Sequence, residues 1–127
     1  MIVETYTDIR PAIEQAGALP FAFIREYSRV VIGAMPQPFD EEQVIEARFF
    51  GEGQEIRLFR NDEGALCAAR LIAEETDVYI EHTHTLTNPK LFGEKLVTRE
   101  YLTADEDGQM IVDQVCMTSW TGGATHG

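Results

Sequence analysis

Closely spaced turn sequences divide most of this chain into short segments rich in aromatic and β-branched residues. Glycine, asparagine and acidic residues form the separators at positions 51–53, 61–64, 74–77 and 105–108, and these residue types favour tight turns. Connections this short join antiparallel neighbours, because a parallel crossover needs about a dozen residues or more. The spacing of the turns therefore predicts an antiparallel β fold.

One short helix is expected before the β-rich part, over residues 8–17. Asp8 can cap its N-terminus, Pro11 suits its first turn, and Gly17 can end it. Strands are expected over residues 21–27, 29–34, 43–50, 54–60, 65–73, 77–85, 96–103 and 109–120. The predicted fold class is mainly β, an antiparallel meander or small β-barrel with one short N-terminal helix. Residues 1–120 are expected to form a single β-rich domain and residues 121–127 a flexible C-terminal tail.

Charged residues predict how the middle strands pair. A two-residue turn with Gly51 first would place Arg48 opposite Glu55 on the next strand. The following hairpins would bring Arg70 near Glu55 and opposite Glu81, which completes an outward-facing row of alternating charges. The middle of the chain is then a four-stranded meander. Its other face is expected to be the core, with Ile56, Leu58, Cys67, Ala69, Leu71, Val78 and Ile80.

The acidic composition restricts the partners of the protein. The 127 residues include 22 Asp and Glu against 10 Lys and Arg, which gives a net charge of −12. Nucleic acid and anionic membranes would repel such a chain, since phosphate binding normally needs a basic surface. We therefore expect no free-standing nucleic-acid binding and no membrane binding.

The sequence also has the features of a cytoplasmic protein. No apolar run approaches the ~20 residues of a transmembrane helix. The first residues lack the basic and apolar regions of a secretory signal. The two cysteines, Cys67 and Cys116, lie in expected strands. We interpret them as reduced core thiols rather than as a disulfide, since cytoplasmic thiols stay reduced.

His82 and His84 are the most chemically suggestive pair. Residues two apart in a strand point to the same side, so the pair could hold a metal ion. No further ligand is evident in the sequence, and two polar side chains on a wet strand face are the simpler interpretation. Both histidines are therefore weak metal candidates.

Other motifs of catalysis are missing from the sequence. Residues 105–108 lack the later ligands of a calcium loop, and we interpret them as an acidic hairpin turn. There is no nucleophile elbow and no phosphate-binding glycine loop. We therefore expect no enzymatic activity and no cofactor.

Arginines with aromatic neighbours are the candidate interaction residues. Eight of the ten basic residues are arginine, and several lie on consecutive expected strands. Arginine and aromatic side chains are enriched at protein interfaces, and arginine can also clamp phosphates. The candidates are Arg25, Arg29, Arg48, Arg57, Arg60, Phe49, Phe50 and Phe59. The alternative is that these arginines only pair with carboxylates of the same sheet, at Glu26, Glu46 and Glu55.

Three segments of the chain, residues 24–33, 46–60 and 100–109, follow one another in an order that resembles a known family. The second segment contains E-A-R-x-F and E-I-R-L-F-R, and the third contains Y-L-x-x-D-E-D-G-Q. Over residues 20–118 this order is similar to the small accessory proteins encoded with type III-D CRISPR-Cas effector complexes. The tryptophan–glycine element of that family is missing here. The comparable place, residues 84–89, reads H-T-L-T-N-P, and the only tryptophan is Trp120.

The resemblance implies a non-catalytic accessory subunit of an RNA-guided, RNA-targeting antiviral complex. Its partners would be the backbone subunits of the effector, with guide RNA contacted only inside the assembled complex. Three alternatives remain open. One is a free-standing acidic interaction protein, such as a phage-type inhibitor that mimics nucleic acid. Another is a small-ligand-binding β-barrel with an unfilled apolar interior. The third is a metal-dependent hydrolase that uses His82 and His84.

Overall fold

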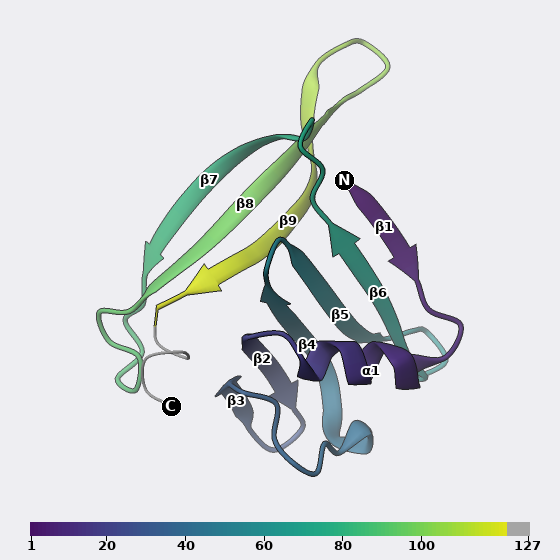
Figure 1. The fold of residues 1–127 in the computed structure, drawn as a ribbon, viewed down its shortest axis with the longest axis vertical. Helices are drawn as coiled ribbons and strands as arrows, with labels where there is room; N and C mark the ends of the chain where they lie inside the picture. Colours follow the sequence, from purple (N-terminus) through teal and green to yellow (C-terminus); the bar gives the residue numbers. More distant parts are fainter. Residues whose placement is uncertain (122–127) are drawn as a thin grey trace.

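Two antiparallel sheets and one α-helix make up the computed structural model, which describes residues 1–121 (Figure 1). Sheet A has the strand order β1-β6-β5-β4-β2-β3 and sheet B the order β7-β8-β9. The strands of sheet A are β1 (Ile2–Thr5), β2 (Phe21–Glu26), β3 (Val30–Gly33), β4 (Val44–Gly51), β5 (Gln54–Arg60) and β6 (Leu66–Ile72). Those of sheet B are β7 (Val78–Thr85), β8 (Lys95–Ala104) and β9 (Met110–Trp120). The helix is α1 (Ile9–Gly17), and a single 3-10 turn, η1 (Glu41–Gln43), precedes β4.

The predicted fold class is confirmed. The structure is mainly β, all strand pairs are antiparallel, and neither sheet closes into a barrel within residues 1–121. Each of the eight expected strands is present, with ends that shift by at most one residue. One strand was not predicted: β1 is four residues long, which is too short to show a clear alternation. The expected tail lies outside the described residues apart from Thr121.

The helix α1 forms where it was expected and covers one face of sheet A. The Asp8 side chain accepts a hydrogen bond of 3.0 Å from the Arg10 backbone N–H, which caps the first turn. Ala12 and Ala16 lie on the buried side of the helix, and their small side chains let it approach the sheet closely. Apolar side chains of four strands complete this core: Ala22, Ile24, Val44, Ala47, Phe49, Ile56, Leu58 and Ala68.

The predicted turn between β4 and β5 is wrong by one residue, which shifts the pairing of the two strands by two residues. The turn consists of Glu52 and Gly53, both with positive φ, so Gly51 pairs with Gln54. Gly51 is required for a different reason: a Cβ there would lie 2.3 Å from the Pro20 side chain. As a result Arg48 lies opposite Arg57. Glu55 lies two positions before Arg57 on β5, diagonally across from Arg48.

The four-stranded meander predicted for the middle of the chain is also wrong. The free side of β6 pairs with β1, where Glu4 lies opposite Arg70, and β7 starts a separate sheet. Glu81 therefore lies opposite Arg99 on β8 and not opposite Arg70. The expected row of exposed charges does not form, and Glu55 is instead buried.

The seven residues expected on one core face are divided between different surfaces. Ile56 and Leu58 pack under the helix. Leu71 packs on the other face of sheet A, in a small cluster with Tyr101 and Cys116 of sheet B. Cys67 is half-buried and Ala69 is at the limit of burial. Val78 and Ile80 are exposed, because sheet B extends beyond sheet A.

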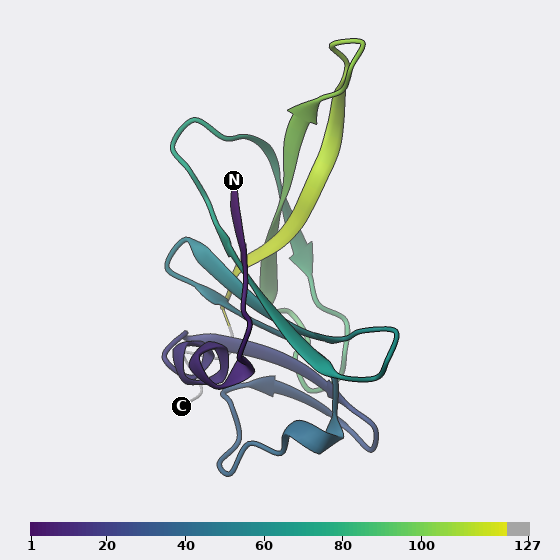
Figure 2. The same ribbon diagram turned by 90° about the vertical axis from the view of Figure 1, so that its right-hand side faces the viewer.

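Sheet B stands on the face of sheet A that the helix leaves open, as Figure 2 shows from the side. The contact between the sheets is made by β9 against β4 and β5. At its lower end the Trp120 ring packs at 5.6 Å from the Phe21 ring and 6.0 Å from the Phe50 ring, measured between centroids. The β8–β9 hairpin rises away from this contact into solvent. The helices of residues 1–121 include none with the length and apolar composition needed to cross a bilayer.

Candidate functional site

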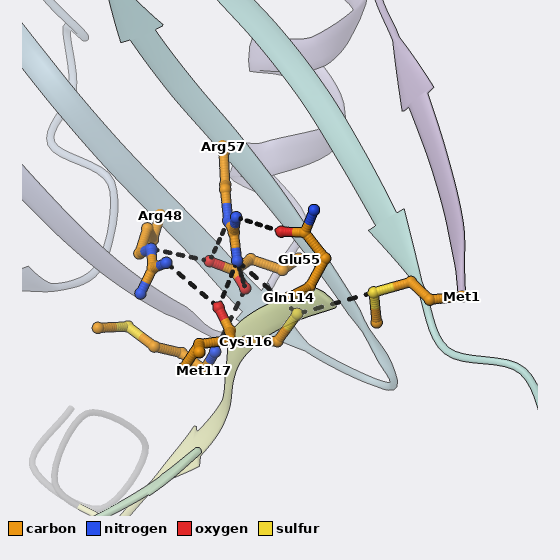
Figure 3. A network of polar contacts seen from close by, with 8 residues as sticks. Met1, Arg48, Glu55, Arg57, Gln114, Cys116 and Met117 are labelled. Carbon is orange, nitrogen blue, oxygen red and sulfur yellow. Dashed lines mark hydrogen bonds and ion pairs between the residues drawn. The ribbon is translucent and has the colours of Figure 1, made fainter. Parts of the chain in front are cut away.

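A buried charge cluster of Arg48, Glu55 and Arg57 lies where the two sheets meet (Figure 3). The Glu55 side chain is only 1% exposed, and its Oε1 atom lies 3.1 Å from the Nε atoms of both arginines. Two arginines directly opposite each other on neighbouring strands would repel. Glu55 compensates them, so the three residues form one unit.

The side chains of this inter-sheet cluster also form hydrogen bonds to the edge of β9 that does not pair with β8. The Val115 carbonyl accepts hydrogen bonds from Arg57 Nη2 and, at 3.3 Å, from Arg48 Nη2. The Met117 N–H donates to Glu55 Oε2 at 3.2 Å, and the Gln114 amide oxygen accepts from Arg57 Nη1 at 3.1 Å. Because β9 is an edge strand, its backbone groups need partners from outside sheet B. Side chains of β4 and β5 supply them and so attach sheet B to sheet A.

The other three candidate arginines lie elsewhere on sheet A. Arg60 donates to the backbone carbonyls of Val44, Gly64, Glu41 and Glu42, which holds the turn before β4. Arg25 and Arg29 are about half-exposed and form ion pairs with Glu46 at 3.4 Å and Glu26 at 2.7 Å. The structure therefore does not bring the five arginines together into one surface.

The three candidate phenylalanines differ in accessibility. Phe49 packs in the helix-side core, and Phe50 packs against Phe21 and Trp120. Both side chains are fully enclosed, so neither can contact a partner, and their assignment as interaction residues is corrected. Phe59 is exposed on the open face of sheet A. Phe49 and Phe50 are consecutive residues of β4, so their side chains point to opposite faces of sheet A and each is buried in a different core.

His82 and His84 point to the same side of β7, as predicted. The Nε2 atom of His82 lies 2.7 Å from Glu100 Oε1, and that of His84 lies 3.0 Å from Thr98 Oγ1. Among residues 1–121, no three His, Cys, Asp or Glu side chains are grouped as metal binding requires. Residues 105–108 form the β8–β9 hairpin turn, in which Asp105 accepts from the backbone N–H groups of Asp107 and Gln109.

A further accessible apolar feature is a patch on one face of sheet B, which sequence reasoning missed. Strand register places six apolar residues on that face, with Glu100 of β8 between Ile80 and Val115. Five of them are between 43% and 55% exposed and the sixth is half-buried. We call this set the outer patch: Val78, Ile80, Leu102, Met110, Val112 and Val115. Contiguous apolar surface of this kind marks interaction sites in soluble proteins.

Acidic residues gather at one end of the outer patch. Residues 73–121 contain ten Asp and Glu against three Lys and Arg. Six of the ten lie in the two turns at the upper end of sheet B: Glu74, Glu75, Asp77, Asp105, Glu106 and Asp107. Lys90 and Lys95 belong to the other end of the sheet, and Arg99 is engaged with Glu81 and the Tyr79 ring. The surface therefore combines an apolar centre with a negative end.

A cleft of about 330 Å³ lies between the sheets on the other side of β9. Met1, Leu71, Tyr101 and Cys116 supply much of its apolar lining, and Glu55, Glu81 and Arg99 its charges. All three charged groups already have partners: Glu55 is held in the inter-sheet cluster, and Arg99 donates to Glu81 and the Tyr101 hydroxyl. The cleft is therefore open, but each charged group in its lining is already paired.

The thiol of Cys116 is expected to be unreactive. Burial, together with the nearby Glu55 carboxylate, raises the pKa of this thiol to about 12, and only the thiolate attacks alkylating agents. Iodoacetamide at about pH 8 should label half-buried Cys67 well before Cys116 in the folded protein, and both cysteines equally in urea. Equal labelling of both thiols in the folded protein would contradict this assignment.

The same shift has a defined effect on stability. The raised pKa means that the folded state holds the Cys116 proton more tightly than the unfolded state does. Its contribution to stability is complete below the ordinary pKa of 9.0 and is lost as pH rises toward about 12.

Comparison with known proteins identifies no relative: no protein-family model matches the chain, and no curated protein matches it significantly.

Proposed function

We propose that the protein is a non-catalytic subunit that joins a larger complex through the outer patch. The single observation that supports this function is the position of the patch. Five exposed apolar side chains share one face of a sheet that extends away from the rest of the fold. Soluble proteins rarely leave such a surface uncovered. The negative end adds selectivity for a partner with basic residues beside an apolar centre.

The resemblance to type III-D CRISPR-Cas accessory proteins supplies the candidate complex. The partners would be backbone subunits of the cytoplasmic effector, which bind guide RNA and therefore carry basic surfaces. A net charge of −12 disfavours direct capture of RNA by this chain. Arg25 and Arg29, the two candidate arginines with large exposed fractions, are placed to approach RNA only after the protein has docked.

A capture experiment with paired variants tests this function. Val78→Ser with Val112→Ser removes apolar area from the outer patch, and Tyr27→Ser with Val30→Ser removes exposed apolar area at the β2–β3 hairpin. The tagged proteins are mixed with effector backbone subunits and guide RNA. We expect the patch variant to lose capture at least about ten-fold, which corresponds to roughly 1.4 kcal/mol, while the control variant binds as the wild type does.

Two results would contradict the proposal. Equal capture by the patch variant and the control variant would place the interface elsewhere. Failure of the wild type to capture any subunit would remove these subunits as partners. Circular dichroism and thermal unfolding establish in each case that both variants are folded.

The acidic half of the molecule favours one second candidate, a free-standing inhibitor that mimics nucleic acid. Its carboxylates would bind a basic protein surface in a way that weakens steeply with salt. In the same experiment, binding that is lost at high salt but survives in the patch variant would support the inhibitor instead of the subunit.

A further inference from the structure

The free edges of the two sheets differ in how well they can accept another strand. Sheet A ends in β1 and β3, each four residues long. Sheet B ends in β7 and in β9, whose edge the inter-sheet cluster occupies at Val115 and Met117. The β7 strand is eight residues long and pairs with β8 without a bulge from Val78 to Thr85.

Strand β7 also lacks the features that protect a sheet edge. Proteins usually shield long edges with proline, lysine, bulges or a covering segment. The sequence of β7, V-Y-I-E-H-T-H-T, has no proline, glycine or lysine. Seven of its eight residues are exposed, and β8 is its only hydrogen-bonded neighbour within residues 1–121. A straight row of backbone donors and acceptors is therefore open to solvent.

We propose that β7 accepts an extended segment of the partner protein as a fourth strand of sheet B. This inference rests on the proposed function and specifies how the partner binds. Val78 and Ile80 of β7 belong to the outer patch, so an added strand would continue the patch with its own apolar residues at every second position. On the opposite face, Glu81 would lie beside an added side chain, which favours lysine or arginine there.

Charge decides between a foreign segment and a second copy of this chain. The half of the chain that forms sheet B holds ten acidic and three basic residues. Two copies paired edge to edge would bring these negative surfaces together, and a register centred on Glu81 would place two carboxylates opposite each other. A segment that contains lysine or arginine would instead be attracted to the acidic surface beside this edge. The occupant is therefore a lysine- or arginine-containing extended segment of a partner protein.

Two adjacent proline variants, His82→Pro and Thr83→Pro, test the inference and control each other. Successive residues of an antiparallel strand turn their N–H groups alternately toward the paired strand and outward. One variant therefore breaks a hydrogen bond to β8 and lowers the melting temperature. The other removes only an outward N–H, which proline tolerates at a sheet edge. This second variant is the informative one.

The readouts are capture of the effector backbone subunits and amide hydrogen exchange of β7. We expect the well-folded proline variant to lose capture at least about ten-fold. We also expect bound subunits to slow exchange at alternate amides of β7 in the wild type. Capture equal to the wild type, together with unprotected β7 amides, would overturn strand addition. The outer-patch function would still stand if Val78→Ser with Val112→Ser lost capture.

Two further outcomes are decisive. A stable dimer of the free protein that the well-folded proline variant dissolves would show that a second copy occupies the edge, which overturns the assigned occupant. If the wild type captures no subunit at all, strand addition by this partner and the proposed function both fail.

Discussion

Replacing Glu55 with alanine is expected to lower the free energy of unfolding by about 3 kcal/mol. Breaking a buried ion pair on one side typically costs about 3–5 kcal/mol, because a charge remains buried without a partner. Here two arginines lose their shared carboxylate, and the Met117 N–H loses its acceptor. We choose the low end of the range because Arg48 and Arg57 are 31% and 22% exposed, so water replaces part of the interaction.

Urea unfolding followed by circular dichroism measures this effect, with Glu46→Ala as the matched control. Glu46 lies on the same sheet and pairs with Arg25, but both side chains are about half-exposed. Exposed pairs contribute at most about 1 kcal/mol. A Glu55→Ala variant no less stable than the Glu46→Ala variant would show that the cluster does not hold the sheets together.

Replacing all three residues of the inter-sheet cluster separates the effect of its charges from that of its hydrogen bonds to β9. Apolar residues at Arg48, Glu55 and Arg57 together would remove every charge of the cluster, a change that is often neutral or stabilising for isolated buried pairs. In this protein the Val115 carbonyl and the Met117 N–H would lose their partners as well. The Met117 N–H is part-buried, and leaving such a backbone group unpaired costs about 1–3 kcal/mol. The triple variant should therefore remain less stable than the wild type.

The local elements could be predicted because each depends on residues close in sequence. Asp8 and Pro11 define the start of α1, and the acidic and glycine-containing turns define the strand ends. The register of the β4–β5 hairpin could not be predicted in the same way. It depends on the contact of Gly51 with Pro20, thirty-one positions earlier, which requires a residue without a side chain. The sequence pattern alone fits a turn that begins at Gly51 equally well.

The burial of Glu55 was missed for a related reason. A glutamate between arginines on neighbouring strands has the same sequence pattern on a wet surface as in a buried cluster. Only the position of β9 over this face distinguishes the two cases. Pairing of β1 with β6 likewise joins residues about seventy positions apart, and it releases β7 to begin a second sheet.

The outer patch was missed because its residues have the composition of a core. Val78 and Ile80 alternate with polar residues, which correctly predicts that they share one face. The same pattern predicts burial of that face when the sheet is assumed to be covered. In the structure no element of residues 1–121 covers it, so the pattern that indicates a core inside the fold indicates a docking surface here.

Replacing Trp120 with alanine is expected to have the second large effect, a loss of about 3–5 kcal/mol. The ring is 5% exposed and fills the space between sheet B and the rings of Phe21 and Phe50. Alanine leaves a cavity at the one aromatic contact between the sheets. Amide hydrogen exchange should show sheet B opening before sheet A, because the helix-side core does not involve Trp120.

Trp120→Phe is the matched variant. It keeps an aromatic ring against Phe21 and Phe50 and removes the indole N–H, which is buried without a hydrogen-bond partner among the described residues. The cost should stay below about 1.5 kcal/mol, since the loss of packed volume is partly offset by removal of an unpaired polar group. Equal destabilisation by both variants would show that a phenyl ring cannot replace the packing of the indole, which contradicts this prediction. Preferential exchange of sheet B in the alanine variant would instead establish that the packed ring holds sheet B, and with it the outer patch, against sheet A.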